Sequence, residues 1–261
     1  MSNKVALLRL SAPMQSWGTK SHFNIRDTGR EPTKSGVVGL VCSTLGICRD
    51  DPPNMGSPSL LDIAALRFGV RVDREGQLRY DFQTAGCGTF NGEKYGIVKT
   101  DGKLGAGKLS WRYYLADAVF LVGFEGPEPI IQKILAAAKT PRWFVFLGRK
   151  AFVPSESLTL RDGGLRDGPL ESALRDEPWL IREQEAIQNA MVREREFEYP
   201  PAPAPKQLRF ICDIKPNEPH EVKEHLRTDA PLCFAHLNRN HGPRLVKEWS
   251  ESIPSETGEN K

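Results

Sequence analysis

The sequence predicts an α+β fold in which strands and two helices follow the order β-α-β-β-(insertion)-β-α-β, which is close to β-α-β-β-α-β. Two observations indicate this order: an apolar strand pattern almost at the N-terminus, and two helix patterns that are each followed by strand patterns. Such an order is typical of ferredoxin-like and RNA-recognition-motif folds. The chain has 261 residues, of which 39% are hydrophobic and 26% charged, as expected for a globular protein with a substantial core.

The first half of the pattern begins with Val5–Leu10 (VALLRL), which we expect to be a buried strand. A polar loop leads to a helix expected at Ser35–Leu45, which is apolar on all sides and therefore buried. Leu66–Val72 and Leu78–Gln83 are expected to be strands, joined into a hairpin by a turn at 73–76.

The second half opens with a glycine-rich segment, 85–107, in which seven glycines alternate with lysines and aromatic residues. This segment is too long for an ordinary hairpin loop, and loops of this length are usually functional or disordered. Ser110–Phe124 is expected to form paired strands or one long bent strand, and Pro129–Lys139 an amphipathic helix with proline near its first position. Trp143–Leu147 is the last strand expected in this half.

The remaining residues are expected to be an extension to this core. The stretch 155–182 is rich in loops, with a short helix near 169–176, and 183–198 is charged and compatible with a helix. A proline-rich connector at 199–206 precedes a late strand at 207–214. We therefore expect a core over 1–154 that contains an insertion at 84–109, and a loop-rich C-terminal extension over 155–261 whose late strand packs on that core.

Bulk charge and cysteine content restrict the class of protein. The formal net charge of +3 is too small to indicate a binder of bulk nucleic acid, but residues 1–50 carry seven bases against three acids. Five scattered cysteines are most simply small core residues in a reducing compartment. No apolar run reaches the roughly 18–20 residues that span a membrane, and no cofactor motif is present. We expect a cytoplasmic protein without membrane contact or cofactor.

The segment from Leu7 to Asp51 contains the strongest functional pattern. Bases and hydroxyls gather in its loop and at the start of the expected helix, where free backbone N–H groups favour a phosphate. The candidate phosphate contacts are Arg26, Arg30, Thr33, Lys34 and Ser35. The alternative is a solvated loop in which Thr33 or Ser35 merely caps the helix.

Gln15 and Trp17, which follow the first strand, also have both a functional and a structural interpretation. Gln15 has an amide that is able to read a base edge or to bond the backbone, and Trp17 is able to stack on a base or to cover the core.

Three motifs in a fixed order resemble a known family. They are APMQSWG at 12–18, TGREPTKSG at 28–36, and LGICRDD at 45–51, with FLGRKAFVP at 146–154 as a fourth, glycine-containing element. This order resembles the CasD-type subunit of the type I-E CRISPR Cascade complex, which belongs to the fifth Cas family of the RAMP superfamily. The likeness is dense over 5–51, moderate to about 154, and thin thereafter.

The resemblance implies a RAMP fold with a protruding thumb, formed here by the glycine-rich insertion. It also implies a non-catalytic subunit that binds and caps the repeat-derived 5′ handle of CRISPR RNA in antiviral defence. Its partners would be that RNA, CasC-type backbone subunits and a CasA-type large subunit, with target DNA contacted only indirectly. The RNA-binding residues that we expect on this basis are Gln15, Trp17, Lys20, Arg26, Arg30, Thr33, Lys34, Ser35, Lys94, Lys99, Lys103, Lys108, Arg149 and Lys150, with Phe90 and Tyr95 on the thumb.

Three alternatives remain open from the sequence. A metal-independent endoribonuclease would need a base, a cation and an acid; His22, Lys20 and Tyr113 could be assembled for this, although no motif joins them, and we expect no catalytic residue. Cys233, His236 and His241 offer a loose zinc spacing with only three ligands, so we expect no metal. A scaffold that contacts only protein is the third alternative.

Overall fold

The computed structural model describes most of the chain. The described residues are 3–49, 56–86, 88–99, 101–181, 207–215, 224–235 and 239–252. The charged segment 183–198, the proline-rich connector 199–206 and the acidic end of the LGICRDD motif, which were considered above, lie outside these residues. The longest helices in the described ranges have twelve residues, about half of what a membrane crossing needs.

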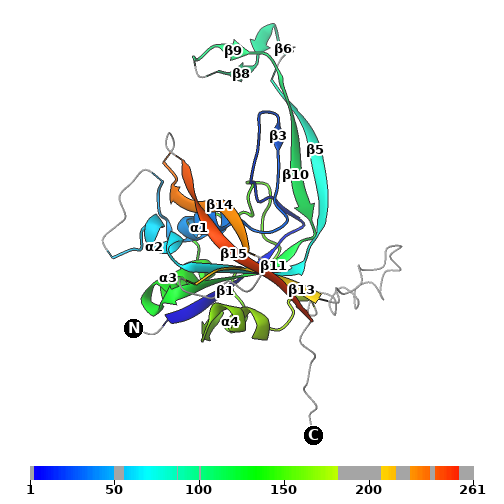
Figure 1. The fold of residues 1–261 in the computed structure, drawn as a ribbon. Helices are drawn as coiled ribbons and strands as arrows, with labels where there is room; N and C mark the ends of the chain where they lie inside the picture. The colour runs from blue at the N-terminus through cyan, green and yellow to red at the C-terminus, as the bar shows by residue number, and fades with distance from the viewer. Residues whose placement is uncertain are drawn as a thin grey trace, which may run out of the picture.

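One antiparallel sheet of seven strands forms the body of the protein (Figure 1). Its strand order is β12-β1-β11-β4-β13-β15-β14, and every neighbouring pair is antiparallel. The strands are β1 (Asn3–Ser11), β4 (Arg67–Arg74), β11 (Val119–Pro127), β12 (Leu165–Asp167), β13 (Gln207–Asp213), β14 (Glu224–Cys233) and β15 (Asn240–Ser252). Strands that are distant in sequence therefore share one hydrogen-bonded layer.

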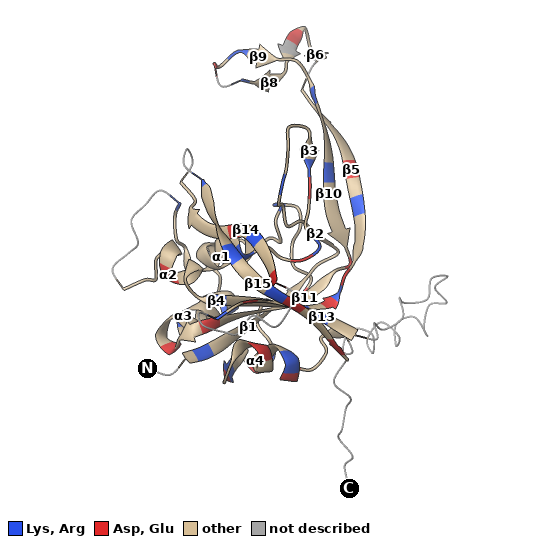
Figure 2. Cartoon of the chain, in the orientation of Figure 1, with Lys and Arg blue, Asp and Glu red and all other residues tan. Residues whose placement is uncertain are grey.

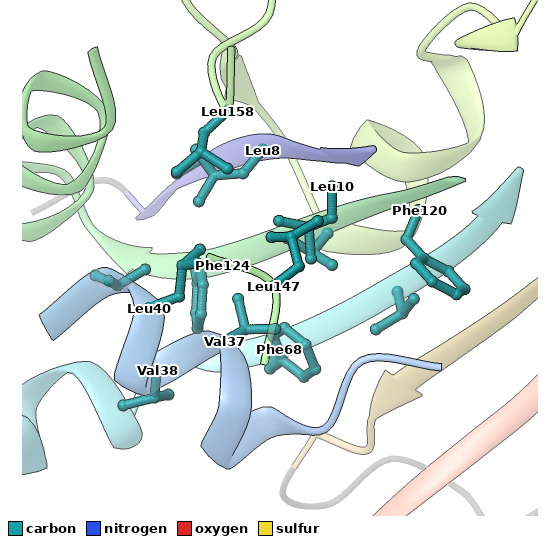
Figure 3. Packing of buried hydrophobic residues seen from close by; sticks show 14 of the residues in the cluster. Leu8, Leu10, Val37, Val38, Leu40, Phe68, Phe120, Phe124, Leu147 and Leu158 are labelled. Atoms are coloured by element: carbon teal, nitrogen blue, oxygen red, sulfur yellow. The ribbon is translucent and has the colours of Figure 1, made fainter. Parts of the chain in front are cut away.

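Helices cover both faces of this sheet, which is why four consecutive residues of β1, Val5–Leu8, are apolar. The helices are α1 (Lys34–Leu45), α2 (Leu60–Ala64), α3 (Glu128–Lys139) and α4 (Leu170–Asp176). Because side chains alternate along a strand, Leu8 and Leu10 of β1 pack with α1 and α3, as Figure 3 shows from close by. Val5 and Leu7 point to the other face and pack with Leu174 of α4.

A long two-stranded arm projects from this body (Figure 1). β5 (Gln77–Ala85) and β10 (Lys108–Ala116) pair over nine positions, and short strands β2 (Met14–Gln15) and β3 (Ile25–Arg26) pair with β10. The tip carries β6 (Gly88–Phe90), β7 (Glu93–Tyr95), β8 (Ile97–Val98) and β9 (Leu104–Gly105). We call residues 77–116 the arm.

The expected helices are confirmed, but the expected hairpin between Leu66–Val72 and Leu78–Gln83 is wrong. β4 pairs with β11 and β13, while β5 pairs with β10. Gly76 lies between them at φ +71°, and a Cβ there would lie 2.7 Å from the Ala116 carbonyl oxygen. The glycine thus allows a sharp turn that directs the chain out of the sheet and into the arm.

The strand expected at Trp143–Leu147 is also wrong. These residues form turns and irregular backbone, and Phe144 is 94% exposed. The Leu147 N–H donates to the Phe152 carbonyl at 2.7 Å, and its own carbonyl accepts from the Ser16 N–H at 3.1 Å. Local hydrogen bonds therefore satisfy backbone groups of this segment. At the edge of the sheet, β12 is the strand that pairs with β1.

The C-terminal part contributes more to the sheet than one late strand. The late strand is present as β13, and β12, β14 and β15 join the same sheet without having been expected. β14 and β15 mix charged and apolar residues with partial exposure, which hides the alternation that normally reveals a strand.

Candidate functional site

The N-terminus of α1 does not offer an open phosphate cradle, because the protein fills it with its own carboxylate. Thr33 caps the helix by accepting from the Gly36 N–H at 3.2 Å, and Asp229 accepts from the Lys34 N–H at 2.7 Å. Lys34 is only 6% exposed, and its Nζ donates to the Leu66 carbonyl at 2.8 Å and to Asp213 at 2.9 Å. The phosphate-binding role expected for Thr33 and Lys34 is therefore contradicted.

Arg244 completes the network around Lys34. Its guanidinium donates to Asp213 at 2.5 Å and to both oxygens of Asp229, at 2.6 and 3.0 Å. Two cations thus face two carboxylates, which neutralises their charge and anchors α1 to β13, β14 and β15. No local pattern in the sequence indicates this network, because Asp229 lies 195 positions from Lys34.

Gln15 and Trp17 are structural residues. Gln15 is fully buried, and its amide donates to the carbonyls of Leu10 and Ala118 at 3.2 and 2.7 Å. Its Oε1 accepts from the indole N–H of Trp17, which is 2% exposed. Every hydrogen-bonding group of both side chains is used inside the protein, so the expected base contacts are contradicted and the core-packing alternative holds.

The loop that carries Lys20 and Arg26 is organised by one carboxylate. Asp27 accepts from the backbone N–H groups of Thr19 and Lys20 and from the hydroxyls of Thr19 and Ser21, at 2.7–3.2 Å. Burial opposes ionisation, but these hydrogen bonds outweigh it and lower the pKa of Asp27. Lys20 and Arg26 remain exposed on this ordered loop.

Three arginines converge at the root of the arm. Arg26 of β3 lies opposite Arg112 of β10, and Arg149 reaches the same place from the loop after α3, where its Nη2 donates to the Tyr113 carbonyl at 2.7 Å. The Nη1 of Arg149 is buried and has no hydrogen-bond partner among the described residues. Burial is the main cause that lowers the pKa of Arg149, and the charges of Arg112 and Arg26 lower it further. The charge of Asp81 opposes this shift. We call Arg26, Arg112 and Arg149 the arginine cluster.

A glycine holds Arg149 in this position. Gly148 adopts φ +96°, and a Cβ there would lie 1.8 Å from the Ser16 carbonyl oxygen. The loop therefore packs backbone against backbone on the segment after β1. This close approach leaves no room for a side chain at position 148, which explains why the motif FLGRK has glycine directly before the arginine.

The other expected contacts lie around the cluster and along the arm. Figure 2 shows Lys and Arg on β3, β5 and β10. Arg30 and Lys150 are exposed and Ser35 is half-buried, while Lys108 lies on β10. At the tip, Lys99, Lys103, Phe90 and Tyr95 are exposed, and the side chain of Lys94 lies outside the described ones. Arg112 was not among the expected contacts, because it lies inside the strand expected at Ser110–Phe124 and no motif marks it.

The two faces of the arm differ in chemistry. Arg112 and Asp81 lie opposite each other on the face toward Arg149. On the other face, Tyr80 packs against Tyr113 with ring centroids 5.6 Å apart, and Phe82 packs against Trp111 at 5.3 Å. The Tyr113 ring is thus held on the aromatic face, and the described residues show no hydrogen bond or ring contact that joins it to His22.

The comparison with protein families decides the identity. A family described as "CRISPR-associated protein (Cas_Cas5)" matches residues 6–247. The chain belongs to this Cas5 family. The Cas5 match covers the body, the arm and the arginine cluster together.

Relatives of this Cas5 protein include a curated protein and two solved structures. "CRISPR system Cascade subunit CasD" of Escherichia coli (strain K12) is 33% identical over 155 residues, which are 56% of this chain and 65% of that relative. The chain thus matches slightly less than two thirds of the relative's length. A "Crystal structure of Cas protein" matches with a TM-score of 0.64, 33% identity and 95% coverage of both chains. A "CRISPR RNA-guided surveillance complex" chain matches with a TM-score of 0.68, 30% identity, and coverage of 96% and 91%.

The zinc alternative has no support among the described residues, where no three potential ligands gather. Cys233 and His241 are described, and His236 lies outside.

Proposed function

We propose that this chain is the CasD-type subunit of a type I-E Cascade complex and that it binds and caps the 5′ handle of CRISPR RNA without cutting it. Family membership supports the assignment to a CRISPR system, and the likeness to the E. coli CasD and to a chain of a surveillance complex supports the assignment to Cascade.

The observation that carries the RNA-binding role is the arginine cluster. A buried guanidinium nitrogen without a partner is costly, and three arginines in one place repel one another. A phosphate between them removes both costs, because it offers acceptors to the Nη1 of Arg149 and negative charge to all three. The handle backbone is the phosphate source that this family membership favours.

The strand order of the sheet supports the same proposal. The order β12-β1-β11-β4 is the order in which the strands of a β-α-β-β-α-β unit lie in a ferredoxin-like sheet, with α1 and α3 as its two helices. We assign the body to a RAMP fold on this basis, and the arm to its thumb. Exposed lysines at the arm tip extend the positive surface away from the cluster.

The partners follow from the two faces of the arm. The face with Arg112 serves the RNA, whereas the aromatic face with Tyr80 and Phe82, each more than half exposed, suits a protein neighbour. In this proposal CasC-type backbone subunits and the CasA-type large subunit are the neighbours, and target DNA is reached only through the assembled complex.

The test is handle binding by single arginine variants of the full chain. Arg149→Ala is expected to weaken binding to a synthetic handle RNA by about tenfold or more, consistent with the loss of a charge-assisted contact. It is also expected to lower the slope of log K against log[salt] by about 0.7 per lost phosphate contact. Arg149→Lys should restore only part of the affinity, because lysine cannot bind a phosphate through two nitrogens.

Arg175→Ala is the matched control, since Arg175 lies on α4, on the opposite face of the sheet, and pairs with Glu251. Wild-type affinity in Arg149→Ala would contradict the assignment of the site. For the absence of cutting, labelled repeat RNA is incubated with the wild-type chain in EDTA; intact RNA supports the proposal, and discrete fragments that disappear in His22→Ala contradict it.

A further inference from the structure

A groove lies beside the Gly148 loop. It has a volume of about 900 Å³ and is bounded by α1, the segment 16–18, the segment 143–148 and the adjoining ends of β14 and β15. No pattern in the sequence predicted this groove. Three of the residues expected to bind RNA, Trp17, Thr33 and Ser35, form part of its wall.

Two neighbouring aromatic side chains are displayed at the groove. Trp143 is 42% exposed and Phe144 is 94% exposed. Phe144 is therefore almost entirely accessible to a ligand, and Trp143 is accessible over part of its surface. Large exposed rings at adjacent positions are unfavourable in water and mark a binding surface.

The charged side chains among the described lining residues of the groove are all basic. Arg49, Arg239 and His241 line it, and none of the described lining residues is Asp or Glu. Neither arginine forms an ion pair with another described residue. Burial, followed by the charge of Arg239, lowers the pKa of His241, so its ring is neutral at pH 7 and has both a donor and an acceptor nitrogen. Such a lining complements an anionic ligand with aromatic, hydrogen-bonding parts.

The groove is continuous with the proposed RNA site. Gly148 lines it, and the next residue, Arg149, belongs to the arginine cluster. Gly18 lines it as well, at the start of the loop that leads to Arg26. Because Gly148 and Arg149 are consecutive, the groove and the arginine cluster lie on neighbouring parts of one loop.

We propose that this groove binds unpaired nucleotides of the RNA, with at least one base stacked on Trp143 or Phe144 and phosphates held by Arg49 and Arg239. The proposal rests on the RNA-binding function above and adds a second subsite to it. Stacking of a base on an aromatic side chain and cationic contacts to the backbone are the common means of holding single strands.

The experiment uses the full chain and handle RNAs that carry the fluorescent base 2-aminopurine at one position at a time. We expect quenching at one or more positions on binding, and loss of that quenching in the double variant Trp143→Ala/Phe144→Ala, with binding weakened about tenfold. Arg239→Glu should weaken binding and lower the salt slope by about 0.7 or more.

Matched controls keep the result interpretable. Leu226→Ala removes an exposed apolar side chain on β14, and Lys139→Glu makes the same charge reversal on α3; both should bind as the wild type does. Melting temperatures of all variants establish that they are folded.

Three outcomes overturn the inference. If the groove variants keep wild-type affinity and quenching while Arg149→Ala loses binding, the subsite is wrong and the proposed function stands. If the wild-type chain does not bind handle RNA at all, both fail. If the groove variants bind RNA normally but no longer bind an acidic, apolar segment of a neighbouring subunit, the groove is a protein dock.

Discussion

At the residue scale, the side chains with the most suggestive sequence context turned out to be buried. Gln15, Trp17, Thr33 and Lys34 are all less than 9% exposed, and each has internal partners. Arg149, by contrast, has a nitrogen that the described protein leaves without an acceptor. A polar group that the fold satisfies maintains structure, whereas a buried polar group without a partner calls for another explanation, and our proposal assigns that role to a bound phosphate.

Lys34→Ala should therefore act on stability and not on RNA binding. Removal of Lys34 takes one of its charged partners from Asp213, which keeps Arg244, so the free energy of unfolding is expected to fall by about 1–3 kcal/mol. Urea unfolding measures this loss, with Lys20→Ala, an exposed lysine, as the control that changes it by less than about 0.5 kcal/mol. A folded Lys34→Ala protein whose handle binding has a reduced salt slope would show that Lys34 contacts RNA after all.

At the element scale, ion pairs connect the C-terminal strands to the rest of the sheet. Arg67 of β4 pairs with Glu125 of β11 and Glu171 of α4, and Lys247 of β15 pairs with Glu171. Burial alone would raise the pKa of Glu171, but hydrogen bonds from Arg67 and Lys247 outweigh it and hold the pKa at about 2. A single carboxylate thus fixes α4 against two strands that are distant in sequence.

The lowered pKa of Glu171 makes a prediction for acid stability. Because the folded value lies below the ordinary 4.5, the stabilisation is complete above pH 4.5 and is lost as the pH falls from 4.5 to about 2. The loss from this group is on the order of 3 kcal/mol. Urea unfolding between pH 2 and 6 should show a weaker pH dependence in Glu171→Gln, and an unchanged one in Glu93→Gln at the arm tip. Equal pH dependence in Glu171→Gln and the wild type would contradict this account.

At the scale of the whole molecule, the body and the arm are separate in structure and in proposed task. The body is a seven-stranded sheet covered on both faces, and its core includes residues from β1 to β15. The arm is a two-stranded ladder with little buried surface of its own, as its exposed Tyr80, Phe82 and Leu109 show. Stability therefore resides in the body, and the arm tip should be removable without unfolding it.

Replacement of residues 86–107 by Asn-Gly tests this separation. Ala85 and Lys108 face each other in the ladder, so a two-residue turn closes the shortened hairpin. The melting temperature should stay within about 2 °C of the wild type, while the salt slope of handle binding falls by about 2 because Lys94, Lys99 and Lys103 are lost. The control Phe90→Ala/Tyr95→Ala retains these lysines and should keep the slope. An unfolded shortened protein would show that the tip supports the body.

The sequence by itself determined the elements whose signals are local. A run of apolar residues identified β1, the apolar stretch Ser35–Leu45 identified α1, and proline near the start marked α3. The motifs also identified the family, because their order depends only on sequence. The loop after α3 was also chosen as a candidate site from sequence, and its role in RNA binding stays a prediction.

Only the tertiary structure decided which charges are free. Asp229 and Asp213 come from β14 and β13 and neutralise the start of α1, where local sequence indicated an open phosphate site. Arg26, Arg112 and Arg149 come from three distant segments and meet at the root of the arm. Whether a charge is paired depends on partners that are brought together by strand pairing over long separations, and local composition carries no record of those partners.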